Sequence, residues 1–458
     1  MTFRRILVAN RGEIALRVIR TCRLLGIETV LATSDADRDS APARLADRAV
    51  CIGPGRPTES YLKVDTIVQA ALGVGADAIH PGYGFLSERA ALARRCEDNG
   101  INFIGPTASQ IESVGDKLRA RAAAEAANVP VVPGGPVSTP DEGLALGRII
   151  GTPLLVKAVG GGGGRGMKRV ERLEDLAEAI ELASAEAGAA FGDARVYVER
   201  YVTSGRHVEV QILGDGSGRV IHLGERDCSA QRRYQKLVEE ATAPRLADPL
   251  REQLCDAAVR FASRLAYRGA GTVEFLVDTE RESFYFLEMN ARIQVEHPVT
   301  EAITGVDIVA QQIAIASGEG LRLSQKDYQP SGHAIECRIN AEDPTRDFQP
   351  SPGVVSDVLW PSGPGIRVDT HIVPGARVPP FYDSLLGKII AHGPDRSSAL
   401  LRLQGALEST RVSGVHTNLA FHRMLTADSE FIAGGFDTGF VPRFLARSIA
   451  SAKDNHRG

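Results

Sequence analysis

The chain lacks the features that mark several classes of protein. Its six cysteines are scattered along 458 residues without a Cys-x-x-Cys pair, which argues against a zinc site or a disulfide framework and favours reduced thiols. No apolar run approaches the roughly 18 residues that span a bilayer, and the N-terminal run at 6–9 is too short for a signal peptide. The net charge of −4, without a basic tail or an arginine block, disfavours nucleic acids and anionic membranes as partners. We therefore expect a soluble, cytoplasmic protein.

The composition is that of a large globular protein. Hydrophobic residues make up 43% of the chain and charged residues 24%. Since single cores rarely grow past roughly 250 residues, we expect about two to four domains. In the first 105 residues, short apolar strands alternate with amphipathic helices, which predicts an open, mainly parallel α/β sheet. The expected strands lie at 6–9, 29–31, 50–52, 77–79 and 103–104, and the expected helices at 13–25 and from about 88.

The pattern changes beyond residue 105. A helix at 109–126 leads to 129–136, where prolines and glycines indicate a boundary. The next stretch, to about residue 202, is small and is interpreted as a lid, with a helix at 173–190 and a strand at 196–199. The remainder has hairpin signatures, which predict a mainly antiparallel region. The expected strand pairs are 208–213 with 219–223 and 272–278 with 284–290.

A glycine-rich loop is the most informative local feature. Five consecutive glycines, Gly160 to Gly164, follow an apolar run that contains Lys157. Because glycine has no Cβ and adopts positive φ at little cost, such a loop can bring backbone amides against phosphate oxygens. It is not a P-loop, since Gly166 is followed by Met167, and it does not open the helix that a dinucleotide fingerprint requires. We interpret it as the tip of a β-hairpin that closes over a nucleotide, with Lys157 as a charge for phosphate. The alternative is a flexible linker.

Acidic and amide side chains occupy two expected neighbouring strands. Glu288 and Asn290 share one face of their strand, because side chains alternate, and an antiparallel neighbour can set Glu274 beside them. Two carboxylates and an amide oxygen suit Mg²⁺ or Mn²⁺, which keeps its other positions for water and phosphates. The alternative is that these acids face solvent on half-exposed strands. The matched set on two strands favours a metal site.

The run after Asn290 carries further polar residues at period two. Arg292, Gln294 and Glu296 are expected to continue the face of Glu288 and Asn290. An arginine can hold a small planar anion with two hydrogen bonds, and Glu296 is a candidate general base. A surface ladder of salt bridges is the alternative. Four other basic residues are ordinary when taken singly and gain significance only from a family pattern: Lys117, Lys236, His207 and Arg338.

At this point the sequence resembles the biotin carboxylases of the ATP-grasp superfamily. The resemblance runs from the first strand to about residue 440, and several matching stretches are long and specific. The matching segments are 9–15, 80–88, 160–167, 225–229, 288–300 and 336–343.

The resemblance implies a three-domain ATP-grasp fold of the α/β and α+β classes. It comprises an N-terminal open parallel α/β sheet, a small mobile lid and a mainly antiparallel C-terminal domain. The expected divisions are 1–105 for the N-terminal domain, 106–130 for a helical linker, 131–203 for the lid and 204–446 for the C-terminal ATP-grasp and biotin carboxylase domain.

The resemblance also implies roles for individual residues. Bicarbonate would be held by Lys236, Arg292, Gln294 and Val295, with Glu296 as the base. Arg338 would stabilise the biotin enolate, and Tyr83 would lie near the biotin ring. Two metal ions, Mg²⁺ or Mn²⁺, would be bound by Glu274, Glu288 and Asn290. The expected ATP contacts are Lys117, Lys157, Gly163, Gly164, Gly166, Glu199, His207, Gln231, Leu276 and Glu288.

The implied activity is ATP-dependent carboxylation of biotin with bicarbonate through carboxyphosphate. Because the chain shows no Ala-Met-Lys-Met biotin-attachment sequence and no carboxyltransferase segment, the expected partners are a biotin carboxyl carrier protein and a carboxyltransferase subunit. The final acceptor, an acyl-CoA or another molecule, is left open. So is a homodimer, because Leu24 stands where bacterial relatives have a glutamate at their dimer contact.

Two positions on the nucleotide side differ from the bacterial acetyl-CoA carboxylase subunits. Arg200 replaces the usual lysine, and Tyr234 replaces a common histidine. Two other functions remain as alternatives. Another ATP-grasp ligase, joining a carboxylate to an amine, would not need the run from Arg292 to Glu296 together with Arg338. A non-catalytic scaffold would tolerate the loss of these residues.

Overall fold

The N-terminal region is a five-stranded parallel sheet with helices packed around it. The computed structural model describes residues 3–159 and 167–455. The strand order is β3-β2-β1-β4-β5, and all the pairings are parallel, as the alternating pattern predicts. The strands are β1 Arg5–Val8, β2 Glu28–Thr33, β3 Arg48–Cys51, β4 Ala78–His80 and β5 Asn102–Phe103. The helices are α1 Gly12–Leu24, α2 Ala41–Leu45, α3 Val64–Val74 and α4 Ala90–Asp98.

The helix expected at 109–126 is wrong as a single element. The structure has α5 Ala108–Gly115 and α6 Lys117–Ala126, separated by Asp116. The carboxylate of Asp116 accepts hydrogen bonds from the backbone N–H groups of Leu118 and Arg119, so it caps the second helix. Because Asp116 has an extended backbone, α6 starts in a new direction.

A four-stranded antiparallel sheet with two helices forms the small unit expected at 131–203. Its strand order is β6-β9-β7-β8. The strands are β6 Gly134–Val137, β7 Leu154–Ala158, β8 Met167–Val170 and β9 Val196–Arg200, and the helices are α7 Pro140–Ile150 and α8 Leu176–Phe191. The pairing of β7 with β8 confirms the hairpin expected on either side of the glycine loop. The loop, with Gly163, Gly164 and Gly166, lies outside the described residues.

The largest sheet has eight antiparallel strands in the order β14-β13-β10-β11-β12-β15-β22-β20. Both expected hairpins are present in it, but β11 is much longer than the expected 219–223. The strands are β10 Gly205–Asp215, β11 Val220–Arg232, β12 Gln235–Ala241, β13 Arg268–Asp278, β14 Ser283–Asn290, β15 His333–Asn340, β20 Ile366–Thr370 and β22 Leu385–Gly393. The associated helices are α9 Asp248–Arg264, α10 His297–Thr304, α11 Ile308–Ala316, α12 Arg396–Ser409, α13 Leu419–Ala427, α14 Ser429–Ala433 and α15 Phe440–Asn455.

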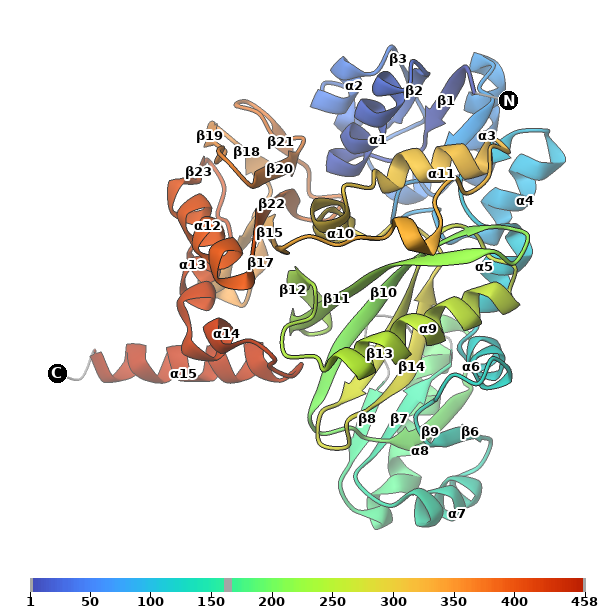
Figure 1. Cartoon of the computed structure of the whole chain (residues 1–458), viewed down its shortest axis with the longest axis vertical. Coiled ribbons are helices and arrows are strands. Elements are labelled where there is room, and N and C mark those ends of the chain that lie inside the picture. The colour runs from blue at the N-terminus through green and yellow to red at the C-terminus, as the bar shows by residue number, and fades with distance from the viewer. Residues whose placement is uncertain (1–2, 160–166, 456–458) are drawn as a thin grey trace.

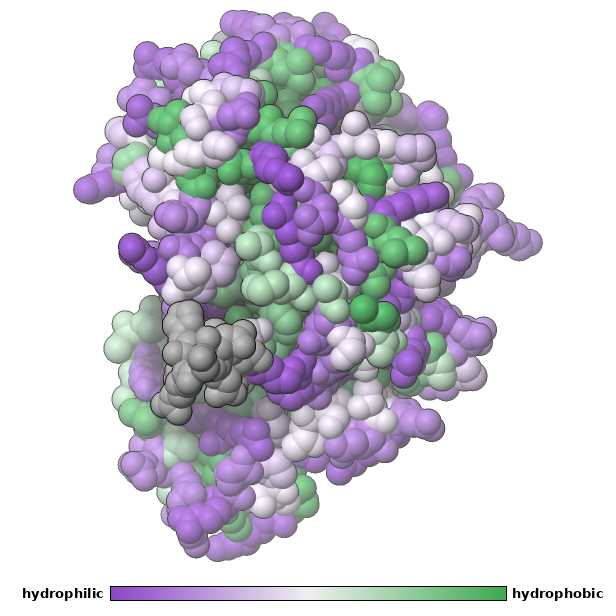
Figure 2. Space-filling view, turned by 90° about the vertical axis from the view of Figure 1, so that its left-hand side faces the viewer, coloured by the Kyte–Doolittle hydropathy of each residue, from purple (hydrophilic) through white to green (hydrophobic). Residues whose placement is uncertain are grey.

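Three two-stranded ribbons complete the fold: β16 Glu342–Asp343 with β17 Gln349–Pro350, β18 Gly353–Val354 with β21 Arg377–Val378, and β19 Asp357–Leu359 with β23 Arg411–Ser413. Figure 1 shows the parallel sheet at one end of the molecule, the small unit at the other and the large sheet between them. On the face shown in Figure 2, hydrophobic side chains are interspersed with hydrophilic ones.

The two faces of the large sheet differ in character. Ile335 and Cys337 on β15 pack in the apolar cluster that includes α12, whereas Ala334 packs with Val299 of α10. Because side chains alternate along a strand, the charged residues at even positions of β15 share the side of Ala334. Polar groups are therefore gathered on the side of the sheet that carries α10.

Among the described residues, no single helix is long and apolar enough to cross a membrane. One pair, His297–Thr304 with Ile308–Ala316, meets the criteria of length and composition together but is bent by 97°.

Candidate active site

Carboxylates from three neighbouring strands meet on one face of the large sheet. Glu209 on β10 pairs in register with Glu274 on β13, which in turn pairs with Glu288 on β14. Asn290, two residues along β14, donates from Nδ2 to Glu274 Oε1 at 2.8 Å. The structure thus brings together the three residues that the sequence predicts as metal ligands. It adds Glu209, which the sequence analysis missed.

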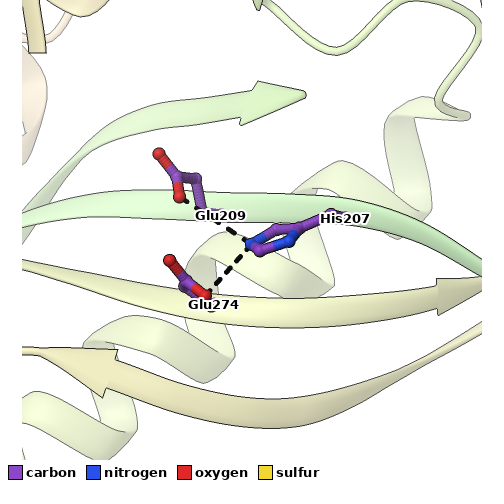
Figure 3. A group of neighbouring side chains, drawn as sticks. All are labelled: His207, Glu209 and Glu274. Atoms are coloured by element: carbon purple, nitrogen blue, oxygen red, sulfur yellow. Dashed lines mark ion pairs between the residues drawn. The ribbon is translucent and has the colours of Figure 1, made fainter. Parts of the chain in front are cut away.

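His207 lies against the same carboxylates. Its Nε2 atom is 3.1 Å from Glu274 Oε2 and 4.0 Å from Glu209 Oε2, as Figure 3 shows. The nearby charge of Glu274 raises the pKa of His207 against the opposing effect of burial. The donor atoms of these three side chains lie within 4.8 Å of one another, so a cation can be shared among them.

Lys236 is the cation at the centre of this cluster. Its Nζ atom donates to Glu209 Oε2 at 2.6 Å, to Glu274 Oε1 at 2.9 Å and to Glu296 Oε1 at 2.7 Å. Burial opposes its charge, but Cys228 and the three carboxylates outweigh burial and hold its pKa well above the usual range. The ammonium group is therefore charged and fixed between the acids of β10 and β13 and the start of α10.

Glu296 accepts from two different cations. Its Oε1 atom is bound by Lys236, and its Oε2 atom accepts from Arg338 Nη2 at 2.8 Å. Glu296 has no exposed surface and immediately precedes the first residue of α10. Burial alone would raise its pKa, but Lys236 and Arg338 hold it well below the ordinary range.

Arg338 is fixed from its other side by Glu239. Its Nε atom donates to Glu239 Oε1 at 2.6 Å, and Glu239 has no exposed surface. Glu336 faces Glu239 across β12 and β15, but its two oxygens have no hydrogen-bond partner among the described residues. Arg338 therefore pairs with Glu239 and Glu296, not with the nearby Glu336.

The expected continuation of the strand through Arg292 and Glu296 is wrong. Strand β14 ends at Asn290, and α10 begins at His297 with Pro298 in its first turn. Proline has no N–H and a fixed φ, so it favours the start of a helix over a strand ladder. The residues between are an irregular connection, and they converge because the chain bends.

Arg292 is held on this connection by several polar groups. Its Nε atom donates to Glu88 Oε2 at 2.8 Å, and its Nη atoms donate to Asn290 Oδ1 and Gln294 Oε1, each at 3.2 Å. Gln294 is 4% exposed, and its Nε2 group has no partner among the described residues. An unsatisfied buried donor beside a guanidinium is well suited to bind an anion.

The expected nucleotide contacts lie beside this cluster. Lys157 on β7 forms a close ion pair with Glu199 on β9. Burial lowers the pKa of Lys117, while Glu288 and Glu199 favour its charge. The Nε2 group of Gln231 is 3.3 Å from His207 Nδ1.

Three other residues on the nucleotide side are placed by the structure. Leu276 pairs in register with His207 and is half-buried. Of the two positions that differ from bacterial relatives, Arg200 donates to the Tyr285 hydroxyl at 2.6 Å, and Tyr234 is 59% exposed.

Tyr83 contacts Glu13, in the first turn of α1. Its hydroxyl donates to Glu13 through a short hydrogen bond, and burial together with Glu13 raises its pKa. The ring lines a cavity of about 130 Å³ together with Arg11, His371 and Asp383. The expected biotin-side residue is thus at the edge of a small cavity lined by both polar and apolar groups.

The sequence analysis did not assign several charged residues that build the site: Glu88, Glu209, Arg226, Glu239 and Glu336. Only Glu209 has a clear local signal, because it lies two residues from His207 on an expected strand and must share its face. The others depend on partners that are distant in the chain.

Three family models match the chain in succession. They are "Biotin carboxylase, N-terminal domain" over residues 2–111, "Carbamoyl-phosphate synthase L chain, ATP binding domain" over 116–324 and "Biotin carboxylase C-terminal domain" over 336–443. Together they span nearly all of the residues that form the site.

Similar proteins extend over almost the whole chain. A biotin carboxylase of Nostoc sp. is 52% identical over 96% of this chain and 99% of its own length. A pyruvate carboxylase subunit of Methanothermobacter thermautotrophicus is 49% identical over 96% of this chain and 90% of its own length.

A solved structure shows the same fold. The biotin carboxylase domain dimer of the 2-oxoglutarate carboxylase of Hydrogenobacter thermophilus, in complex with MgADP, ADP and bicarbonate, superposes with a TM-score of 0.91. It is 46% identical, and the match covers 97% of this chain and 98% of that one.

Proposed function

The chain belongs to the biotin carboxylase family, and from this membership we propose that it carboxylates carrier-bound biotin with bicarbonate and ATP. The observation that carries the proposal is the position of Glu296, which is buried between Lys236 and Arg338 with one oxygen on each. A carboxylate in this position can take a proton from one substrate as its two cations move to bind the anions that form.

The first half of the reaction uses the groups around Glu296. Lys236, Arg292, Gln294 and the backbone of Val295 hold bicarbonate, and Glu296 removes its proton. A bicarbonate oxygen then attacks the γ-phosphorus of ATP and displaces ADP, which gives carboxyphosphate. The unpartnered Nε2 group of Gln294 supports this placement, since a bound anion satisfies it.

The second half uses Arg338 and Tyr83. Carboxyphosphate separates into CO₂ and phosphate, and the phosphate takes the proton from N1 of biotin. The nitrogen then bonds to CO₂. Negative charge develops on the ureido oxygen of biotin, and Arg338 stabilises it, an electrostatic contribution of about 3 kcal/mol in a dry site. Tyr83, at the edge of the cavity, orients the ring.

Metal and nucleotide are held on the opposite side of Lys236. Glu274, Glu288 and Asn290 offer hard oxygen atoms on adjacent strands, which fit two Mg²⁺ or Mn²⁺ ions. When bound, these ions neutralise charge on the phosphates. The described residues that contact ATP in this proposal are Lys117, Lys157, Glu199, His207, Gln231, Leu276 and Glu288.

Glu296 becomes a stronger base as it loses its present partners. With Lys236 and Arg338 attached, its pKa lies well below the ordinary range, so it holds a proton weakly. Binding of bicarbonate to Lys236 and of biotin to Arg338 draws both cations away and makes the carboxylate more basic. Catalysis thus begins when bicarbonate is in place and becomes faster when biotin is added.

We propose the domain division 1–105, 106–130, 131–203 and 204–446 for this function. The pairing of β12 with β15 supports it, because this pairing joins the ATP-binding strands and the strand of Arg338 in one sheet. We also propose that the chain is one component of a multi-subunit carboxylase and receives biotin on a carrier protein, with a carboxyltransferase subunit using the product. A pull-down from the source cell, probed for a biotinylated protein, tests this.

The activity is tested by phosphate release from MgATP. Purified protein should release phosphate only when bicarbonate is present, and faster when free biotin is added, whereas Glu296→Gln should not. Turnover that ignores bicarbonate but responds to an amine would favour another ATP-grasp ligase. No turnover under any condition would favour a scaffold.

A further inference from the structure

A buried lysine outside the predicted site contacts the irregular connection between β14 and α10, which carries the proposed bicarbonate ligands. Lys388 lies in the middle of β22 and has no exposed surface. Its Nζ atom donates to the carbonyl oxygen of Val295 at 2.6 Å. The connection from β14 to α10 has no regular ladder of its own, so contacts of this kind determine its geometry.

Lys388 has a counter-charge that connects it with Tyr83. Its Nζ atom is 3.2 Å from Glu13 Oε1, and the same oxygen accepts the short hydrogen bond from the Tyr83 hydroxyl. Glu13 is 4% exposed, in the first turn of α1. A buried ammonium group is costly without such a partner. A continuous chain of contacts therefore runs from Tyr83 through Glu13 and Lys388 to Val295.

The sheet places Lys388 beside Arg338. The two residues pair in register on β22 and β15, so their side chains share one face. Arg338 binds the carboxylate of Glu296, and Lys388 binds the carbonyl of the preceding residue, Val295. Two adjacent cations of one sheet thus hold two consecutive residues of the connection.

Two other acids, Glu336 and Asp369, lie close to Lys388 in the sheet, and Asp369 already has a partner. Asp369 pairs with Lys388 in register, but its two oxygens accept from Arg367 at 2.9 and 2.6 Å. Glu336 accepts no hydrogen bond from the described residues, so the contacts of Lys388 Nζ are with Glu13 and Val295, the two groups that belong to the site.

We propose that Lys388 is a positioning residue for the bicarbonate site. By holding the carbonyl of Val295 it orients the peptide group between Val295 and Glu296, and through Glu13 it connects this peptide with Tyr83 on the biotin side. The proposal rests on the proposed function and adds a residue to it.

The test compares Lys388→Met with Lys388→Arg, which keeps the charge and N–H donors on a side chain of similar length. The dissociation constants of bicarbonate, in the presence of MgADP, and of MgADP alone are measured by titration calorimetry. We expect Lys388→Met to weaken bicarbonate binding roughly 10- to 100-fold, as loss of a residue that orients a ligand does at metal sites. MgADP binding should change less than about twofold, and Lys388→Arg should recover part of the loss. Lys326→Met, at an exposed lysine, is the control.

Two outcomes would overturn the proposal. Bicarbonate binding by Lys388→Met equal to that of the wild type would show that the carbonyl contact does not matter. Parallel losses of bicarbonate binding, MgADP binding and melting temperature, with no recovery in Lys388→Arg, would show a merely structural role. Because binding is measured without turnover, a wild type that binds bicarbonate but releases no phosphate contradicts the proposed function and leaves this test valid.

If Lys388→Met does not fold, Glu13→Gln provides the same test. It keeps the shape of the side chain and removes the counter-charge, so that Lys388 turns toward the unpartnered carboxyl group of Glu336 and leaves Val295. Bicarbonate binding should weaken several-fold. Unchanged binding in this variant would overturn the proposal.

Discussion

Glu296 and Arg338 form a partly buried, hydrogen-bonded ion pair, with Arg338 Nη2 2.8 Å from Glu296 Oε2. The proposed base and the proposed enolate-stabilising group are thus bound to each other before substrates arrive. Each group weakens the activity of the other, because the guanidinium lowers the basicity of the carboxylate and the carboxylate neutralises the charge of the guanidinium. This relationship makes the two halves of the reaction separable by mutation.

Replacement of Arg338 by alanine should affect mainly the second half. Biotin carboxylation should fall roughly 10²-fold, the loss typical of removing one oxyanion donor. No other described cation contacts both Glu296 and Glu239, so none is held where it could replace Arg338. Bicarbonate-dependent ATP cleavage should fall much less. Both rates are measured on the same preparation, by carboxybiotin formation and by phosphate release.

Glu239→Gln is the matched control for that variant. It removes the ion pair between Glu239 and Arg338, which Arg338→Ala also removes, but it leaves the guanidinium in place. If Arg338 acts only structurally, the two variants should lower the melting temperature and both activities alike. Carboxylation at the wild-type rate by a folded Arg338→Ala protein would contradict the assignment outright.

Arg226 should contribute strongly to stability. It has no exposed surface, donates to Glu209 Oε1 at 2.6 Å and also donates to Gln211, Thr272 and Thr300. Arg226→Met leaves a buried carboxylate without this partner, which should cost about 3–5 kcal/mol in the free energy of unfolding. Urea denaturation measures this cost.

The double variant Arg226→Met, Glu209→Gln should regain part of the loss, because it removes the buried charge that has lost Arg226 as a partner. A cost of less than about 0.5 kcal/mol for the single variant, as at an ordinary surface position, would show that the pair does not hold the cluster together.

Glu336 should make stability depend on pH. Its carboxyl group is buried without a hydrogen-bond partner among the described residues, so desolvation raises its pKa well above the ordinary value of 4.5. The folded state therefore binds a proton that the unfolded state releases near pH 4.5, and stability falls as the pH rises from that value toward the folded pKa. Glu336→Gln should abolish this contribution, with a gain over the wild type that grows by at most about 1.4 kcal/mol per pH unit.

Denaturation of both proteins between about pH 5 and pH 8 checks this, with Glu252→Gln at an exposed site as the control. A difference between Glu336→Gln and wild type that stays constant over this range would mean that Glu336 is ionised throughout.

Glu288 should matter mainly for the metal, and its direct contact with the nucleotide should contribute little to binding. Burial and the neighbouring charge of Glu274 raise its pKa, and a bound cation removes this repulsion. Glu288→Gln should weaken binding of MnADP at least about tenfold and leave binding of ADP in EDTA nearly unchanged. Equal losses with and without metal would place Glu288 among the nucleotide contacts alone.

Local sequence pattern predicted the arrangement of Glu274, Glu288 and Asn290 correctly. Alternation along two apolar strands put Glu288 and Asn290 on one face and Glu274 opposite, and the register of β13 and β14 pairs Glu274 with Glu288. The prediction succeeded because strands of a hairpin are close in sequence and their period is fixed.

Local sequence pattern failed to predict charged residues whose ion-pair partners lie on other strands or helices. The expected strand ended at 223, yet β11 continues through the charged residues 225–227 to Arg232, since Arg226 is paired with Glu209 and Glu225 with Arg251. The same is true of Lys388, whose partners Glu13 and Val295 lie in other regions of the chain. Nothing local distinguishes such buried charges from exposed ones.

The central claim is that bicarbonate itself attacks ATP, and the fate of its oxygen atoms tests it most directly. The protein is incubated with MgATP, biotin and bicarbonate labelled with ¹⁸O, and the released phosphate is examined by mass spectrometry. If Glu296 activates bicarbonate to form carboxyphosphate, each phosphate should carry one ¹⁸O atom from bicarbonate. Phosphate without label, in a reaction that still consumes ATP, would show that water attacks instead and would contradict the account.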